Sequence, residues 1–201
     1  MASYCIHCGD RQAYSQPHSC RSCTRWATPF DLDDESFGRL WRASIKTVIE
    51  DIGIPEITWN SFPATAGPDH ISAASWYDPT PPGHLALSLS RPPEEVCLSL
   101  IHEMGHAMLW LHHASEYPRH PRREELIVNG AADIICRRYV IRDYVPRMKA
   151  IGLRACRGIE ELSVAARTSA THVAGQLLEI IDRHSATDTG QGSPNPALPL
   201  S

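Results

Sequence analysis

The spacing of apolar residues along the chain predicts four helices and a few short strands. Apolar side chains recur at intervals of three and four in the helical stretches, which cover residues 31–52, 92–113, 121–144 and 158–184. Alternating stretches predict strands at 56–60 and 84–90, with a further one at 71–76 inside a Pro- and Gly-rich loop. Gly53 and Pro55 end the first helix, and Pro146 breaks the third. This order predicts an α+β domain.

The helix predicted at 92–113 is apolar around most of its circumference, which is typical of a buried helix. Ser90 is placed to cap its start, and Glu94 and Glu95 suit the positive end of its dipole. The pattern H-E-x-x-H lies within it, at residues 102–106. Polar groups on such a helix need partners when they are buried, so this pattern is the first candidate for chemistry.

The H-E-x-x-H pattern places two histidines one helical turn apart on the same face. His102 and His106 can therefore hold one Zn²⁺, at about 2.0–2.1 Å from each imidazole. Glu103 adjoins the first histidine and can act as general base towards metal-activated water. The alternative is two surface histidines and a solvated glutamate, which the apolar surroundings disfavour. The pattern thus predicts a catalytic zinc site.

A catalytic zinc needs a third protein ligand, and the helix predicted at 121–144 offers one. Glu125 lies near its start, and Asn129 and Asp133 continue the same face at intervals of four. We predict Glu125 as the third ligand, with Asn129 or Asp133 holding a ligating imidazole by its other nitrogen. Glu124 points about 100° away and is not preferred. The alternative is a solvated face on a surface helix.

These two helices resemble a known family. The stretches H-E-M-G-H-A-M-L-W-L-H-H and E-L-I-V-N-G-A-A-D-I-I are similar to the gluzincin peptidases of the ImmA/IrrE type, whose pattern is H-E-x-G-H followed by E-x-x-A-N-x-F-A-A. The resemblance spans residues 45–141 and is patchy outside the two motifs. It implies zinc on His102, His106 and Glu125, with Glu103 as the base.

The chain departs from that family at several positions. Val128 stands where the family has Ala, Ala131 stands where it has Phe, and the usual Leu-Met-Pro ending is missing. The family commonly carries a DNA-binding helix-turn-helix or acts on repressors, and the sequence contains no such module. A peptide or protein substrate, such as a regulator, is what the resemblance implies.

A competing interpretation takes all three ligands from one helix. His102, His106 and His112 match the ligand spacing of metzincins, whose geometry needs a Gly that turns the chain. Leu109 occupies that position here, and on a continuous helix His112 lies about 240° round from His106. We therefore prefer Glu125.

The N-terminal segment carries a second metal-type pattern. Two C-x-x-C pairs separated by eleven residues are formed by Cys5, Cys8, Cys20 and Cys23. Two such pairs are a strong signature of a closed structural zinc site, and their separation is somewhat shorter than usual. The segment has little apolar content, so we expect the metal to provide most of its folding energy. The alternatives are a redox dithiol, unrelated thiols, or His7 or His18 as a substitute ligand.

The domain organisation follows from these motifs. Residues 1–28 are predicted to form the zinc ribbon, 29–184 a minimal zincin-like domain and 185–201 a disordered tail. In the zincin-like domain a small sheet packs on the H-E-x-x-H helix and on the glutamate-bearing helix.

The composition of the chain indicates which kinds of partner and which cellular compartment to expect. The net charge of −4 gives no sign of binding to nucleic acid or to a membrane surface. No stretch approaches the ~20 apolar residues of a membrane span, and the N-terminus lacks the features of a signal peptide. Seven cysteines, an odd number, argue against a disulfide framework. We expect a cytoplasmic protein whose ribbon is available to a partner protein.

Together these features predict a zinc metallopeptidase with two Zn²⁺ per chain, one catalytic and one structural. Tyr139 and His172 are candidate donors to the oxyanion. One alternative is a zinc-dependent enzyme that acts on a small molecule. The other is a non-catalytic regulatory or interaction module that retains zinc as a structural element.

Overall fold

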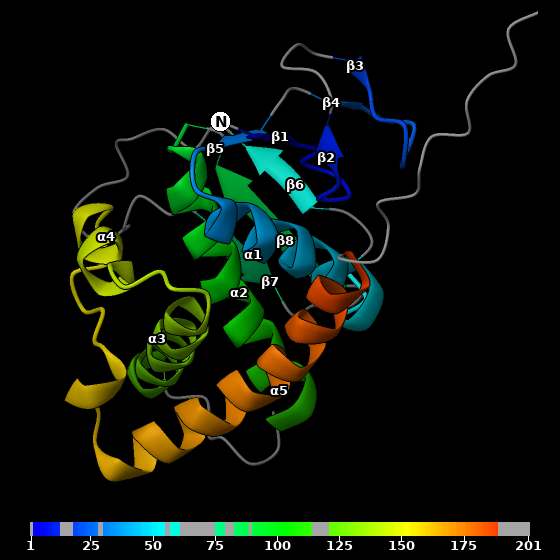
Figure 1. Ribbon diagram of the computed structural model, residues 1–201. Coiled ribbons are helices and arrows are strands. Elements are labelled where there is room, and N and C mark those ends of the chain that lie inside the picture. Colours follow the sequence, from blue (N-terminus) through cyan, green and yellow to red (C-terminus); the bar gives the residue numbers. More distant parts are fainter. Residues whose placement is uncertain are drawn as a thin grey trace, which may run out of the picture.

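The computed structural model describes residues 2–12, 18–27, 30–54, 57–60, 75–78, 83–88, 90–113 and 121–188. Over these residues the chain is α+β, as predicted, with five α-helices and three small sheets (Figure 1). The helices are α1 (Glu35–Lys46), α2 (Pro93–His113), α3 (Pro121–Arg138), α4 (Tyr144–Ala150) and α5 (Val164–Asp188). A short segment η1 (Thr47–Asp51) follows α1, and a second short segment η2 (Ile159–Glu161) precedes α5.

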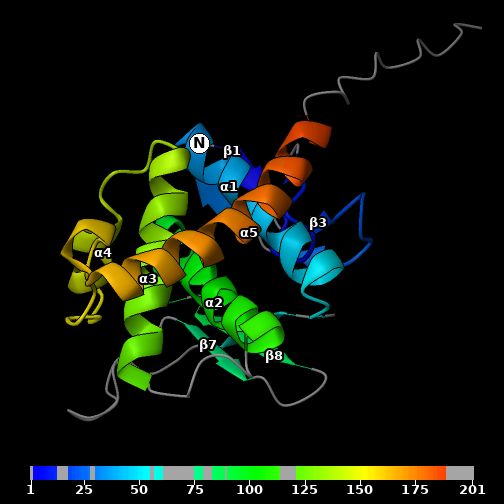
Figure 2. The ribbon, with the colours of Figure 1, turned by 90° about the horizontal axis from the view of Figure 1, so that it is seen from below.

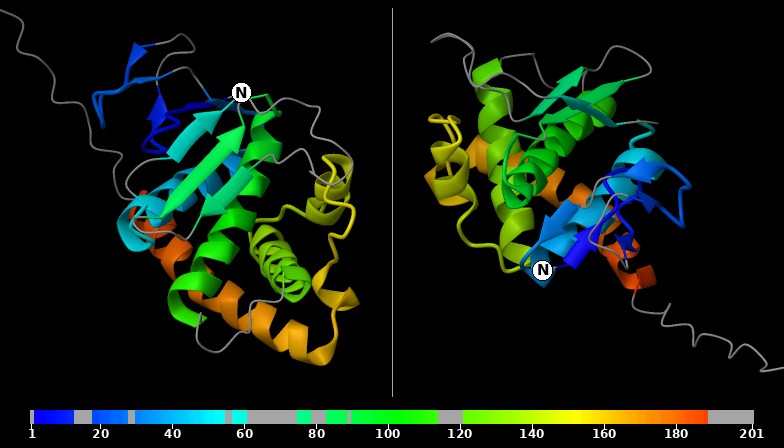
Figure 3. Two further views of the ribbon diagram at one scale, coloured as in Figure 1. Left: turned by 180° about the vertical axis from the view of Figure 1, so that it is seen from behind. Right: turned by 90° about the horizontal axis from the view of Figure 1, so that it is seen from above.

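One of the two three-stranded sheets has the strand order β6-β8-β7. Its strands are β6 (Ile57–Asn60), β7 (Ser75–Asp78) and β8 (His84–Ser88). The central strand β8 runs parallel to β6 and antiparallel to β7, with Ser75 opposite Leu87. The sheet lies against α2, which β8 precedes in the chain (Figure 3). The predicted strands at 56–60 and 84–90 are therefore present, whereas β7 starts at Ser75 and residues 71–74 lie outside the described part.

Helix α2 is the centre of the molecule, as its apolar circumference predicts. It packs against the four other helices, α1, α3, α4 and α5, and also against strands β7 and β8 of the sheet (Figure 2). The side chains of Val96, Leu98 and Ile101, which point in different directions around the helix, are all fully buried. Burial of each such side chain stabilises the fold by about 1.5–3 kcal/mol.

A glycine allows α3 to approach α2 closely. A Cβ atom added at Gly105 would lie 2.9 Å from Cγ1 of Val128, which is closer than carbon atoms pack. Gly105 stands inside the H-E-x-x-H pattern and Val128 lies one turn after Glu125. The close crossing therefore brings the candidate ligands of the two helices together.

The third predicted helix is shorter than expected, and its ending was predicted wrongly. Helix α3 stops at Arg138, Val140 adopts a left-handed conformation with φ of 66°, and Ile141 N–H donates to the carbonyl of Cys136 at 2.8 Å. This is the bonding of a Schellman ending, which usually has Gly at the left-handed position. Pro146 does not break α3; it lies in the first turn of α4, where its missing N–H costs no helical hydrogen bond.

The first helix also starts later than predicted. Residues 30–32 form strand β5 (Phe30–Leu32), and α1 begins at Glu35, with the Asp34 carboxylate accepting from Ser36 N–H at 2.6 Å. An Asp at this position is a strong N-cap. Trp41 of α1 is fully buried and stacks on Phe30, with ring centroids 4.3 Å apart.

The N-terminal segment packs onto α1. Strand β1 (Ala2–Tyr4) pairs with β2 (Arg11–Gln12) and with β5, while β3 (His18–Ser19) pairs with β4 (Trp26–Ala27). Because β5 follows residue 28, this sheet continues past the predicted boundary of the ribbon. The buried side chains of Tyr4, Cys5 and Cys20 join the same core as Leu40 and Trp41. The segment therefore shares the core of the main domain (Figure 1).

The C-terminal helix agrees with its predicted range over most of its length. Its predicted start is the short segment η2, and α5 itself runs from Val164 to Asp188. The first four residues of the predicted tail, 185–188, are therefore helical, and residues 189–201 lie outside the described part. None of the described helices combines the length and apolar character that crossing a membrane requires.

Candidate metal centres

Three predicted ligands meet where α2 and α3 cross. Nε2 of His102 and Nε2 of His106 are 3.2 Å apart, and the Glu125 carboxylate faces both. Its Oε2 lies 3.4 Å from Nε2 of His102, and its Oε1 lies 3.3 Å from Nε2 of His106. Residues that lie far apart in the sequence thus present three ligand atoms to one point.

The separations between these atoms suit a small tetrahedral cation. A tetrahedral zinc with ligands at about 2.0–2.1 Å has ligand atoms about 3.3–3.4 Å apart. The two histidine nitrogens, 3.2 Å apart, come close to that value, and each faces a different oxygen of Glu125, at 3.4 Å for His102 and 3.3 Å for His106. One ligand atom from each of the three residues lies within 4.8 Å of the others, so the cluster could hold a metal ion, and no fourth residue of the described part joins it.

Glu125 has a buried oxygen that a cation could satisfy. Its Oε2 lies 3.4 Å from Nε2 of His102 without the geometry of a hydrogen bond, which is costly for a charged oxygen. Burial raises the pKa of Glu125, but its interactions with His102 and His106 outweigh burial and hold the pKa well below its usual value. The carboxylate is therefore ionised and available as a ligand.

Two side chains, Tyr144 and Asn129, orient His102, and sequence reasoning had named only Asn129. Tyr144, at the start of α4, donates to Oδ1 of Asn129 at 3.2 Å and lies 3.4 Å from Nδ1 of His102. Because the tyrosine proton is used on Asn129, its oxygen accepts from Nδ1–H of His102, and Nε2 keeps a lone pair for the metal. Asn129 therefore acts on His102 through Tyr144 and does not hold the imidazole directly, which differs from the predicted contact.

His106 is oriented by Glu124, which we expected to point away. Nδ1 of His106 donates to Oε1 of Glu124 at 2.9 Å. The two nitrogens of an imidazole point to opposite edges of the ring, so adjacent residues of α3 reach different atoms of the same histidine. Desolvation lowers the pKa of His106, but hydrogen bonds to Glu124 and Glu125 more than offset this and raise the pKa to about 10. The metal-free site therefore holds a proton where a metal would bind.

The predicted general base lies beside the ligands and has a partner of its own. Glu103 is 6% exposed and follows His102 on α2. Its Oε1 accepts a hydrogen bond from the Ser75 hydroxyl of β7 at 2.6 Å. Sequence reasoning missed Ser75, because the serine lies next to a loop rich in Ser, Pro and Gly that contains no distinguishing pattern.

Other predicted residues lie elsewhere. Asp133 accepts from the backbone N–H of Ile159 at 3.0 Å and from Nε of Arg137 at 3.1 Å, so it anchors η2 and does not take the role beside an imidazole that we predicted. His172 is exposed on α5 and is not part of the ligand cluster. The side chain of His112 lies outside the described part of the structure.

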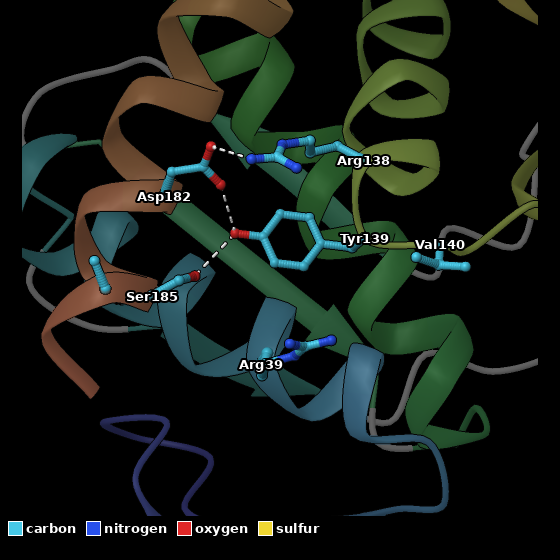
Figure 4. A pocket seen from close by; sticks show the side chains of 7 residues that line it. Arg39, Arg138, Tyr139, Val140, Asp182 and Ser185 are labelled. Carbon is cyan, nitrogen blue, oxygen red and sulfur yellow. Dashed lines mark hydrogen bonds and ion pairs between the residues drawn. The ribbon is translucent and has the colours of Figure 1, made fainter. Parts of the chain in front are cut away.

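Tyr139, the other candidate oxyanion donor, belongs to a different surface. It lines a hollow of about 350 Å³ between α1 and the C-terminal ends of α3 and α5 (Figure 4). Its hydroxyl donates to Asp182 at 3.1 Å and bonds to Ser185 at 2.8 Å. Thirteen residues of α3 separate Glu125 from Arg138, a distance of about 20 Å along the helix. Tyr139 is therefore too far away to serve the ligand cluster.

The four predicted cysteines form the second cluster. Sγ of Cys5 lies 3.7 Å from Sγ of Cys23, Sγ of Cys8 lies 3.7 Å from Sγ of Cys20, and all four sulfurs are within 4.8 Å of one another. A tetrahedral zinc–thiolate site with bonds of about 2.3 Å has sulfurs about 3.8 Å apart. Its neighbours, Cys8 first, lower the pKa of Cys5 to about 5, so a thiolate is present at neutral pH.

The two cysteine pairs have matching backbone turns. In the first pair, the N–H of Cys5 donates to the carbonyl of Asp10, and the N–H of Gly9 donates to the carbonyl of Cys5. In the second pair, the N–H of Cys20 donates to the carbonyl of Arg25, and the N–H of Thr24 donates to the carbonyl of Cys20. Gly9 and Thr24, each directly after a second cysteine, have φ of 75° and 59°. Gly9 is required for a further reason, because an added Cβ would lie 2.9 Å from the Arg42 backbone of α1.

The chain shows no match to a protein-family model, to a curated protein or to a solved structure.

Proposed function

We propose that the protein is a zinc metallopeptidase with a minimal zincin-like domain. His102, His106 and Glu125 hold the catalytic ion, and Glu103 is the general base. The observation that supports this proposal most strongly is the cluster of His102, His106 and Glu125, in which the two imidazole nitrogens lie 3.2 Å apart and each has an oxygen of Glu125 within 3.4 Å. The four cysteines hold a second, structural zinc.

The side chains divide the chemistry among them. Zinc at this position supplies a Lewis acid that activates water and polarises a carbonyl group. Glu103 takes the proton of the attacking water and delivers it to the leaving amine. Tyr144 and Glu124 keep Nδ1 of the two histidines engaged, so that each Nε2 faces the site without a proton when the ion is bound.

The sheet favours a peptide as the substrate. In the sheet order β6-β8-β7, one side of β7 has no partner strand among the described residues. The same strand carries Ser75, which contacts Glu103. An extended peptide that pairs with this edge would lie next to the general base, with main-chain hydrogen bonds holding it in register. A small molecule would make no use of such an edge.

The proposal is tested with Glu103→Gln. This change removes the base and keeps the size of the side chain, so the protein should retain two zinc ions and lose at least about 10³-fold in activity. The probes are fluorescein-labelled casein and a mixed library of fluorogenic peptides, and zinc is counted by elemental analysis.

The matched control is Glu95→Gln, on the same helix but in its first turn, which should keep wild-type activity. Turnover by Glu103→Gln at the level of Glu95→Gln would reject Glu103 as base. Wild-type protein that carries zinc and cleaves none of these probes would reject the peptidase function.

A further inference from the structure

We propose that Ser75 is a positioning residue that sets the orientation of the Glu103 carboxylate. This inference rests on the proposed function. It starts from a single contact, in which the Ser75 hydroxyl donates to Oε1 of Glu103 at 2.6 Å. No other hydrogen bond to this carboxylate comes from the described residues. The orientation of Glu103 therefore depends on a residue of a different element.

The contact has the length that is usual between a hydroxyl group and a carboxylate. Hydroxyl groups approach carboxylates to about 2.5–2.7 Å, closer than they approach neutral oxygens. With Oε1 engaged by Ser75, Oε2 is the oxygen left to receive a proton from water. A glutamate side chain that rotates freely would present either oxygen in several directions, which lowers the rate of proton transfer.

The backbone around Ser75 holds the serine independently of the contact. Ser75 is the first residue of β7 and pairs with Leu87 of β8, whose side chain is fully buried. Strand β7 packs on α2, the helix that carries Glu103. In a strand, a shift of one residue would turn the hydroxyl to the opposite face, so the register of β7 decides whether Ser75 reaches the base.

The same strand is the edge on which the proposed substrate lies. Ser75 therefore connects the position of a bound peptide to the position of the base. Its hydroxyl bonds to the base and to none of the three candidate ligands, and it does not itself take the proton. The expected role is a contribution to kcat, with little effect on KM or on zinc binding.

Three variants test this role. Ser75→Ala removes the donor, Ser75→Thr keeps a hydroxyl on a residue that favours strands, and Ser88→Ala removes a buried hydroxyl of β8 that bonds to Ser90 instead. Each zinc-loaded protein is assayed for kcat and KM on the peptide that the wild type cleaves best. Ser75→Ala should lose about 10- to 100-fold in kcat, with KM within about threefold and zinc content unchanged. Ser75→Thr should recover most of that loss, and Ser88→Ala should match the wild type.

A binding measurement provides a readout without turnover. Acetohydroxamate chelates zinc and donates a hydrogen bond to an adjacent carboxylate, so calorimetry on the zinc-loaded proteins reports whether Glu103 is in place. Ser75→Ala and Glu103→Gln should each bind it at least about fivefold more weakly than the wild type, since one charge-assisted hydrogen bond is lost.

The outcomes separate the two proposals. Equal hydroxamate affinity in Ser75→Ala and wild type, a change in KM alone, or no recovery with Ser75→Thr would overturn the role of Ser75. An inactive wild type that still binds acetohydroxamate through Glu103 and Ser75 would overturn the peptidase function and retain the positioning contact.

Discussion

At the scale of single residues, the two histidines are held by different chemistry. His102 is oriented by a neutral pair, Tyr144 and Asn129, whereas His106 is oriented by the charged Glu124. Burial raises the pKa of Tyr144 well above its usual value, so its hydroxyl stays protonated. A carboxylate partner makes an imidazole a stronger metal ligand than a neutral hydroxyl does, so the two histidines are expected to differ in their affinity for the metal.

The partner of His102 can be tested by removing one hydroxyl. Tyr144→Phe leaves Nδ1 of His102 and Oδ1 of Asn129 without a hydrogen bond in a fully buried position. Zinc affinity at this site should fall by about 10- to 100-fold, measured by competition with a fluorescent chelator. Tyr139→Phe, which removes a tyrosine hydroxyl about 20 Å away along α3, is the control and should leave the affinity unchanged. Equal affinities in the two variants would contradict the role of Tyr144.

The charged surroundings of His106 predict a proton exchange. Its pKa is raised to about 10, so in the zinc-free protein His106 is protonated at pH 7 and loses this proton only as the pH rises through about 10. Zinc bound at Nε2 must displace the proton. Loading this site at pH 7 should therefore release about one proton, and zinc affinity should rise with pH up to about pH 10.

The measurement is calorimetry in buffers of different ionisation enthalpy, on protein whose cysteine site already carries zinc. Glu124→Gln removes a carboxylate that raises this pKa and should lower the number of protons released at pH 7. A heat of binding that is independent of the buffer in the wild type would contradict this prediction.

At the scale of elements, the site depends on how closely two helices cross. Helix α2 supplies His102, Glu103 and His106, and α3 supplies Glu124 and Glu125. Gly105 lets α3 approach, because any side chain there would meet Val128. The strand β7 then closes the other side, with Ser75 on Glu103. The candidate site is complete only where α2, α3 and β7 pack together.

Alanine substitutions at two glycines, one at this helix crossing and one away from it, should change the stability of the protein in opposite directions. Gly105→Ala places a methyl group 2.9 Å from Cγ1 of Val128, so it should destabilise the protein by about 1–3 kcal/mol and weaken zinc binding as the helices separate. Gly175→Ala in α5 meets no atom within 4 Å and should stabilise by about 0.5–1 kcal/mol, since alanine favours helix.

Urea unfolding of the two variants measures these differences. Adding Val128→Ala to Gly105→Ala should restore part of the zinc affinity, because the double variant removes the overlapping methyl group. A Gly105→Ala protein as stable as the wild type would show that the helices do not need this close approach.

At the scale of the whole molecule, the cysteine site and the helical site share one core. Tyr4, Cys5 and Cys20 pack in the same cluster as Leu40 and Trp41, and strand β5 links the N-terminal sheet to α1. Helix α1 in turn packs on α2. Loss of the cysteine site should therefore affect the stability of the entire chain.

Replacing Cys5 and Cys8 by serine tests this expectation. Zinc content should fall from two ions to one, and the melting temperature should drop in a single calorimetric transition, because the ribbon and the helices unfold together. Cys156→Ala, which removes a buried thiol outside both clusters, should keep two zinc ions. Two separate transitions in the wild type, with only the first lost in the double serine variant, would contradict a shared core.

The sequence by itself determined those features that depend on spacing along one element. Four residues of helix bring His102 and His106 to one face, and each C-x-x-C turn brings its own two cysteines together, whatever the rest of the chain does. The apolar circumference of α2 likewise indicated its burial. The α+β class and the strand that precedes α2 followed from the same periodicities.

Only the tertiary structure decided which residues complete the site. Glu124 and Glu125 are adjacent, and their tasks on Nδ1 and Nε2 of His106 follow from where α3 crosses α2. Tyr144 reaches His102 because α3 ends early, at Val140 in a left-handed conformation. Glycine usually occupies such a position, so the sequence did not indicate this helix end. Ser75 reaches Glu103 through strand register. Such contacts depend on the packing of elements far apart in the chain, and local spacing carries no record of that packing.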